Sequence, residues 1–207
     1  MDTLPKEALV VVLSNMSFKD VYSSAHISKR FASVIKTYSF RTAFALKHKG
    51  EWMKRFWRWF QTNSLDSLEQ WLPILIENDI IDPSFDDNTP IAMASDSGYT
   101  NIVKILLADR RVNPAIAQNY PIIRASKFGH TDVVKLLLLD QRVDPSAQSN
   151  KAIIFATENG HVDVVKLLLA DLRVAVSLKE KYIMRVARMY NHAEIANLLE
   201  DFFRKGM

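Results

Sequence analysis

Three histidines come closest in this chain to a set of residues that could do chemistry. His130, His161 and His192 recur every 31 residues, which suggests a ladder of metal ligands. Such a ladder fails on distance, because neighbouring units of a helical stack lie roughly 8–10 Å apart whereas a Zn–N bond is about 2 Å long. Tyr99 takes the same place one period earlier. We therefore expect this position to need a ring for packing or for a local hydrogen bond.

Acidic residues repeat with the same period. Asp132, Asp163 and Glu194 stand where a helix is expected to begin, and a carboxylate is favourable at that positive helix end. Equal spacing keeps them apart, so they do not pair for acid–base work. The chain has no cysteine, and it lacks the phosphate-binding, dinucleotide-binding, zinc-protease and serine-hydrolase motifs. The sequence predicts no catalytic residue, no metal site, no cofactor and no enzyme.

The elements that position these residues are copies of one sequence motif. Gly98, Gly129 and Gly160 each precede a run of apolar residues, and Asn191 opens a weaker fourth copy. A fixed period of this size indicates a repeat array, in which each unit buries its apolar face only against its neighbours. Glycine supplies the positive φ that a turn between two helices needs, and asparagine is the best-tolerated substitute.

The unit resembles the ankyrin repeat. Thr89 and Pro90 are expected to cap and open a first helix, and a small residue recurs where two helices would approach closely, at Ala94, Ala125, Ala156 and Ala187. The resemblance implies an all-α fold, an ankyrin-repeat solenoid of about four to five helix pairs. The usual period is about 33 residues, and the shortening falls in a connecting finger without glycine. An Asp-Pro or Asn-Pro pair favours extended geometry there, so we expect a short, stiff finger rather than a β-hairpin.

The first part of the chain differs in charge and pattern. Residues 1–60 carry 11 Lys and Arg against 4 Asp and Glu, whereas residues 61–207 carry 16 against 19. The pattern Leu-Pro-x-Glu-x-Leu from residue 4, followed by Ser-Lys-Arg-Phe from residue 28, resembles the F-box, although Ser24 stands where F-boxes usually carry Leu. The resemblance implies three short helices that dock onto the Skp adaptor of a cullin–RING ubiquitin ligase. By that analogy the adaptor contacts come from Leu4, Pro5, Leu9, Val12 and Leu13. An N-terminal cap without an adaptor is the alternative.

A basic, aromatic run joins the two parts. Trp52, Phe56, Trp59 and Phe60 fall on one face of an expected helix. We interpret this face as a buried aromatic stripe and the opposite, basic face as exposed to solvent. Nucleic acid or a membrane surface bound by Lys47–Arg58 is the disfavoured alternative. The N-terminus shows no secretory pattern, and no apolar stretch approaches the roughly 18 residues of a membrane span. The expected organisation is an F-box-like module at 1–48 and ankyrin repeats at 49–207. Its units are 51–81 (degenerate), 82–112, 113–143, 144–174 and 175–207 (terminal).

A partner is expected to bind where the copies differ, on the finger tips and the ends of the first helices, which form the concave side of ankyrin arrays. Large apolar groups there would be the strongest anchors. The candidate residues are Phe85, Asp86, Asn88, Asp96, Ile116, Asn119, Lys127, Phe128, Gln148, Asn150, Glu158, Lys179, Lys181 and Arg188.

These patterns favour a protein–protein interaction adaptor. The leading hypothesis is a substrate receptor in which the F-box recruits a ubiquitin ligase and the ankyrin concave face holds an unknown protein target. The alternatives are a plain ankyrin-repeat binding protein without a ligase role, and a nucleic-acid or membrane-surface binder. We expect a monomer inside the cell, in the cytoplasm or nucleus, or in the host cytoplasm if the source is viral. The 31-residue period and the Arg-Val-Asp-Pro link resemble arrays of eukaryotic microbes and large DNA viruses, a resemblance that does not fix the source.

Overall fold

The computed structural model describes residues 72–73, 76, 82–177 and 179–205. The chain forms two compact units, Met1–Asp82 and Pro83–Met207. The helices predicted for residues 1–60, with the F-box positions and the aromatic stripe, lie outside the described residues. In the expected degenerate repeat, Leu72, Pro73 and Ile76 are helical, and Leu72 and Ile76 are buried. The rest of that repeat, and the division at residue 48, stay predictions.

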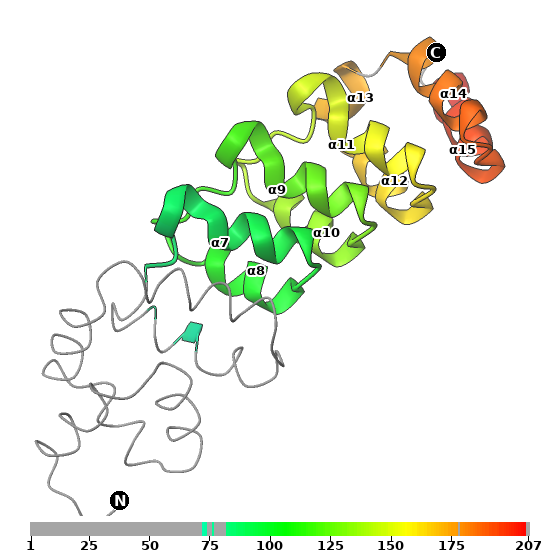
Figure 1. Ribbon diagram of the computed structural model, residues 1–207. Helices are drawn as coiled ribbons and strands as arrows, with labels where there is room; N and C mark the ends of the chain where they lie inside the picture. The colour runs from blue at the N-terminus through cyan, green and yellow to red at the C-terminus, as the bar shows by residue number, and fades with distance from the viewer. Residues whose placement is uncertain (1–71, 74–75, 77–81, 178, 206–207) are drawn as a thin grey trace, which may run out of the picture. The chain divides into compact units, whose positions relative to one another are not determined.

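The second unit is a stack of helix pairs. In Figure 1, α7, α9 and α11 lie side by side in one row and α8, α10 and α12 in another. The first helices are α7 (Phe85–Asp96), α9 (Ile116–Lys127), α11 (Ala147–Glu158) and α14 (Glu180–Met189). The second helices are α8 (Thr100–Leu107), α10 (Thr131–Leu139), α12 (Val162–Leu169) and α15 (Ala193–Lys205), and a short helix, α13 (Leu172–Ser177), lies between the third and fourth pairs.

No strand occurs in the part of the chain that the structure describes. The fingers between the helix pairs are turns, as in the segment from Asp109 to Ala115. The all-α prediction is confirmed. The described fingers, which we expected to be too short for a β-hairpin, contain no paired strands.

The core lies between the two rows. Each second helix buries an apolar stripe, such as Ile102, Val103 and Leu106, which are all fully buried. The alanines that recur in the first helices have no exposed surface either, in all four units. Burying one large aliphatic side chain contributes about 1.5–3 kcal/mol, so the repeated stripe is the main source of stability for the stack. The sequence predicted both features from residue spacing.

Each of the first three units opens its first helix with a left-handed turn. Asp86, Asp87 and Asn88 have φ values of 50°, 54° and 63°, and the same pattern recurs one and two periods later. The right-handed helix therefore starts at Thr89, whose hydroxyl donates to the carbonyl oxygen of Asp86 at 2.6 Å. The prediction that Thr89 caps the helix is wrong, because the residue before the helix is Asn88 and the Thr89 hydroxyl acts as a donor. Pro90 does lie in the first right-handed turn, as predicted.

The asparagine that ends this turn holds the next finger. Asn88 Oδ1 accepts a hydrogen bond from the backbone N–H of Asn113 at 2.6 Å, and Asn119 Oδ1 accepts one from Asp144 at 2.8 Å. Asn88 and Asn119 are buried, and Asn150 at the equivalent position is buried as well. Asparagine suits this position because it tolerates a positive φ and because its short amide side chain can accept a hydrogen bond from the next finger.

The turn glycines meet a second requirement besides their positive φ. Gly129 has φ +74°, and a Cβ built on it would lie only 2.6 Å from Nδ1 of His161 in the following unit. That ring is fixed by its Nε2, which is 2.9 Å from the carbonyl oxygen of Lys127. The other two histidines repeat the arrangement with Gly98 and Gly160 at bonds of 2.9 and 3.0 Å. The predicted structural role of the histidine ladder is confirmed.

Asn191 is the one turn position of the described units at which a side chain is present. It has φ +60° at the position of the turn glycines. The three described histidines each lie against the glycine of the unit before their own, so none of them covers Asn191. A side chain is therefore tolerated in the fourth unit and excluded from the other three.

We predict that Gly129→Ala destabilises the array by about 2–4 kcal/mol. A left-handed alanine costs about 1–2 kcal/mol, and displacing His161 removes a hydrogen bond of about 1 kcal/mol as well as its packing. Asn191→Ala, the matched control, needs only the positive φ and should cost about 1 kcal/mol. Urea unfolding followed by circular dichroism measures both. Equal losses in the two variants would contradict the role of the histidine.

Candidate functional site

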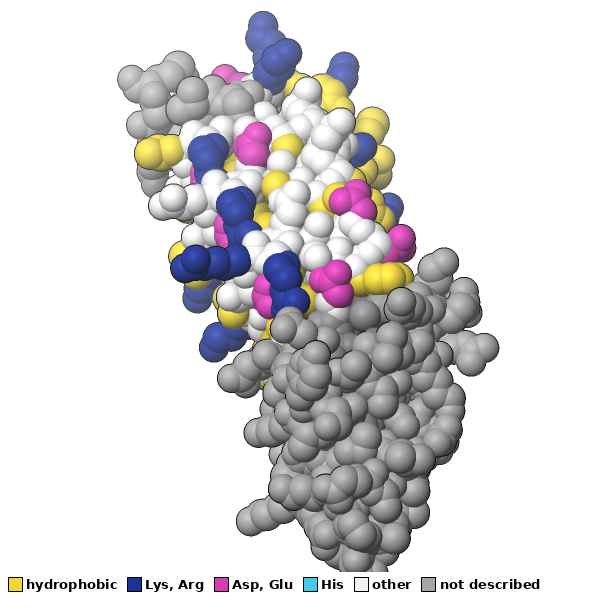
Figure 2. Space-filling model, turned by 90° about the vertical axis from the view of Figure 1, so that its left-hand side faces the viewer, with side chains coloured by type: hydrophobic (Ala, Val, Ile, Leu, Met, Phe, Trp, Pro, Cys, Tyr) yellow, Lys and Arg dark blue, Asp and Glu magenta, His cyan; other side chains and the backbone are white. Residues whose placement is uncertain are grey.

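An arginine clamp within each of two fingers connects that finger to the one before it. Asp140 and Arg142 form a two-pronged ion pair, with Nε and Nη2 of the arginine at 2.9 and 2.6 Å from the carboxylate. The third nitrogen, Nη1, donates to the carbonyl oxygen of Val112 at 2.7 Å. Arg173 repeats the pattern, with a 2.5 Å bond to the carbonyl oxygen of Val143. Dark-blue and magenta side chains touch in several places on the face drawn in Figure 2.

The clamp was missed in the sequence, although its signal is present. Asp-x-Arg-Val recurs at residues 109, 140 and 171, and its spacing equals that of the glycines. The Arg142 guanidinium hydrogen-bonds the Asp140 carboxylate and holds the pKa of Asp140 below its usual range, against the opposing effect of partial burial. The pKa values of the other two aspartates are lowered in the same way. These charges belong to the scaffold rather than to a binding surface.

We predict that Arg142→Gln lowers the free energy of unfolding by about 1–2 kcal/mol at pH 7. The change removes the ion pair, which solvent screens, and the hydrogen bond to Val112. Lys135→Gln on α10 removes the same charge from an exposed side chain and should cost less than about 0.5 kcal/mol. Because the folded pKa of Asp140 is depressed, the contribution of the pair is present above the unfolded pKa of about 4. The gap between wild type and Arg142→Gln should therefore narrow as the pH falls through the folded pKa, down to the part that the hydrogen bond to the Val112 carbonyl contributes. A gap of the same size at pH 2 and pH 7 would contradict the ion-pair account.

The remaining variable residues lie on the first helices. Phe85 and Ile116 are half-buried at the starts of α7 and α9. Phe128, directly after α9, is 44% exposed, and Lys127 beside it is half-buried. The exposed finger positions are Asp86, Gln148, Lys179 and Lys181, and Glu158 is half-buried at the end of α11.

Other predicted binding residues are engaged within the array. Asp96 forms an ion pair with Arg124, and Arg188 forms one with Glu200 at 3.0 Å. Both pairs are accessible enough for a partner to reach. Asn88, Asn119 and Asn150 are buried, so we leave these three out of the proposed surface.

Cations and aromatic rings alternate along the first helices. The Arg124 guanidinium lies 4.7 Å from the ring centre of Phe128, and the Lys127 ammonium group lies 5.5 Å from that of Phe155. Lys151 lies 5.5 Å from the same Phe155 ring. Tyr120 and Tyr182 extend the series, each with an arginine of its own helix over the ring. Sequence reasoning missed Tyr120, Arg124, Lys151, Phe155, Tyr182 and Arg185, although several of them occupy equivalent positions 31 residues apart.

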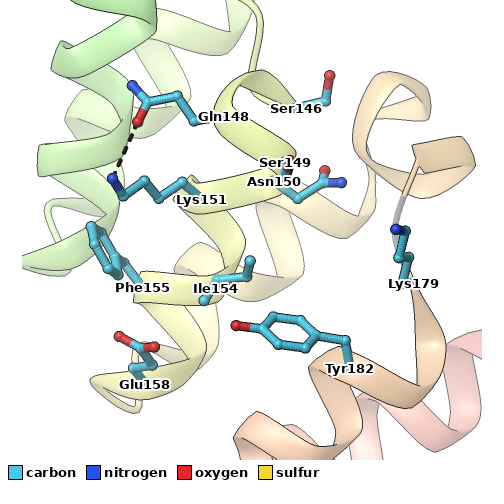
Figure 3. Close-up of a pocket in the computed structure, with 10 residues that line it drawn as sticks. All are labelled: Ser146, Gln148, Ser149, Asn150, Lys151, Ile154, Phe155, Glu158, Lys179 and Tyr182. Atoms are coloured by element: carbon cyan, nitrogen blue, oxygen red, sulfur yellow. Dashed lines mark hydrogen bonds between the residues drawn. The ribbon is translucent and has the colours of Figure 1, made fainter.

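A groove of about 660 Å³ separates α11 from α14. In Figure 3, Lys151, Phe155 and Glu158 line one side of it, and Lys179, directly before α14, and Tyr182 on α14 line the other. The fourth unit differs from the others here because the chain enters α14 through an extended Lys179 with φ −88° and ψ 105°. The left-handed turn of α11 has no counterpart in α14.

The side chains of the described residues were predicted to hold no metal ion. They contain no group of three or more His, Asp or Glu side chains that could hold a metal ion. Within the same residues, no helix is long and apolar enough to cross a membrane. The chemistry that this surface can perform is non-covalent recognition by charge, hydrogen bonds and apolar contact.

Comparison with known families agrees with this geometry. The model for ankyrin repeats in three copies matches residues 91–180 and 122–203, which together exceed half of the chain. The model for the F-box domain matches residues 1–42. No curated protein and no solved structure gave a significant match.

The matched units, with their stacked helix pairs and stiff fingers, define a helical repeat protein built for binding. The chain belongs to the ankyrin-repeat family and carries an F-box domain at its N-terminal end. Both are non-catalytic interaction modules.

Proposed function

We propose that the chain is a substrate receptor of a cullin–RING ubiquitin ligase. The F-box docks on the Skp adaptor, and the first-helix face of the array holds a protein target for ubiquitin transfer. The observation that carries this proposal is the presence of both modules in one chain, an F-box domain at 1–42 and ankyrin repeats at 91–203. F-box domains generally bind this adaptor, and ankyrin repeats generally bind proteins. The adaptor contacts are those implied by the F-box pattern, from Leu4 to Leu13, and the role places the chain inside the cell.

The distribution of exposed apolar residues supports the first-helix face as the target surface. Among the described residues, five of the seven exposed large apolar side chains lie on the first helices or directly after them, namely Tyr120, Phe128, Tyr182, Met189 and Tyr190, whereas Leu139 and Leu172 lie elsewhere. None of these residues is in the glycine–histidine contact or the finger clamp that hold the stack. Exposed aromatic side chains are costly to leave bare and useful as anchors for a partner.

The principal alternative is an ankyrin-repeat protein that binds its target without any ligase. It shares the array and differs only in the role of the N-terminal module. Binding of nucleic acid or a membrane by Lys47–Arg58 stays an alternative for residues outside the described part.

We predict that the full chain retains purified Skp adaptor in a pull-down and that a Leu4→Ala/Pro5→Ala double variant does not. The two changes remove apolar side chains that the F-box resemblance places against the adaptor. A Ser14→Ala/Asn15→Ala variant, changed directly after the predicted adaptor positions, should retain it like wild type. Equal and poor retention of wild type and both variants would reject the ligase role and leave the plain binding protein.

The target surface can be mapped separately because the chain has no cysteine. We predict that a photo-crosslinker attached at Lys127→Cys, on the first-helix face, captures target proteins from cell extract. The same group at Lys135→Cys on α10, in the row of second helices, should not capture them. Identical sets of crosslinked proteins from the two positions would contradict the proposed surface.

A further inference from the structure

We propose that the groove between α11 and α14 binds an extended acidic segment of the target that carries a large apolar side chain. This inference rests on the proposed function, since it takes the first-helix face as the target surface, and it adds the chemical class of what is bound.

The charge around the groove is positive and uncompensated. Lys151 and Lys179 line it, and Lys127 lies across the Phe155 ring from α9. Within the described residues, no carboxylate oxygen lies within 4.0 Å of these three ammonium groups, although Lys151 donates to Gln148 Oε1 at 3.2 Å. Glu158 is the one acidic residue among those that line the groove. A segment with several carboxylates therefore fits better than a neutral or basic one.

The lysines are held in position before a partner arrives. Lys127 and Lys151 each place their ammonium group 5.5 Å from the ring centre of Phe155, an attraction of about 0.5–1 kcal/mol at an exposed site. A side chain that is already ordered loses less entropy when it pairs with a carboxylate. The pairing of rings with cations thus favours anionic groups over this part of the groove.

The groove also offers apolar surface. Ile154 on α11 faces Tyr182 on α14, Tyr182 is 43% exposed, and Phe155 lies on the other side of the groove. Charge alone would not distinguish an acidic segment that carries an apolar residue from an acidic segment without one. An aromatic or large aliphatic side chain inserted between Ile154 and Tyr182 would remove apolar surface from water on both partners.

The same residues favour a protein segment over nucleic acid. Single-stranded nucleic acid binds where bases can stack on open aromatic faces beside a continuous basic track. Here two lysines lie over the Phe155 ring, and Glu158 would repel a phosphate. The second unit as a whole is close to neutral, with 16 Lys and Arg against 14 Asp and Glu in residues 83–207.

Fluorescence anisotropy of the full chain with four labelled probes tests this inference. The probes are a twelve-residue Glu/Asp peptide with one central Phe, the same peptide with Ser for Phe, a Lys counterpart with Phe, and a single-stranded oligothymidine. We expect the acidic Phe peptide to bind about tenfold more tightly than each of the others and to weaken with added salt. Preferred binding of the oligothymidine, or equal binding of the Lys counterpart, would overturn it.

Charge reversal locates the binding. Lys151→Glu/Lys179→Glu should weaken the acidic Phe peptide about tenfold or more, whereas Lys104→Glu/Lys135→Glu, on exposed lysines of the second helices, should change it less than twofold. Tyr182→Ser, a neutral change at an exposed ring, should remove the preference for Phe over Ser. Circular dichroism of each variant confirms that the array is folded. Unchanged affinity in a folded Lys151→Glu/Lys179→Glu variant would overturn the groove as the site.

The crosslinking assay separates this inference from the proposed function. If Lys127→Cys still captures its targets when Lys151 and Lys179 are reversed, the target surface stands and the acidic-segment inference fails. If capture at Lys127→Cys is lost when Lys151 and Lys179 are reversed but kept when Lys104 and Lys135 are reversed instead, both the target surface and the acidic-segment inference stand. If Lys127→Cys captures nothing that Lys135→Cys does not, the proposed surface itself fails.

Discussion

The contact between a histidine ring and the glycine of the preceding unit is the constraint on which the rest of the array depends. The ring lies where a side chain would otherwise stand, and its Nε2 reaches a carbonyl oxygen at the end of the preceding first helix at 2.9–3.0 Å. One ring therefore fixes both the spacing and the rotation of two neighbouring units. The arginine clamp and the left-handed asparagine do the same on the finger side, with bonds to backbone groups of the adjacent finger.

Backbone groups are the partners in all three contacts, and this has a consequence for function. A side chain that recognises a backbone carbonyl or amide does not require a particular side chain on the residue that it bonds, and the histidine contact constrains only the turn glycine. The outer positions of the first helices can therefore differ from copy to copy without loosening the stack. The cation–aromatic series and the groove beside α14 occupy these free positions.

Much of the fold could be predicted from the sequence because it depends on local periodicity. The turn at Gly98, the buried Ala94 and the apolar stripe of α8 follow from spacing and from the needs of one backbone conformation. The left-handed turn before Thr89 was not predictable in the same way. Three consecutive non-glycine residues adopt positive φ there, and what stabilises them includes the hydrogen bond that Asn88 Oδ1 accepts from the backbone N–H of Asn113, 25 residues away.

The candidate site was harder to predict for the same reason. Phe128 was found because a large apolar residue at a variable position is unusual, and the structure leaves it exposed. Tyr182 and Lys151 became candidates only when the structure placed them around one groove. Conversely, Asn150 was predicted to lie at an exposed finger tip. The structure buries it, so it belongs to the scaffold, like the equivalent Asn88 and Asn119. Spacing indicates which residues share a face, but not which faces meet.

Native-state hydrogen exchange of the full chain tests the central claim that backbone-directed contacts join the units into one cooperative scaffold. The account predicts that buried amides of α9, α10, α11 and α12 share one opening free energy, since the glycine–histidine and arginine contacts connect these helices on both sides. Amides of α14, which lacks the left-handed turn, should exchange through a smaller opening of the terminal unit. Separate opening free energies for each helix pair, with no common value across α9 to α12, would contradict the account.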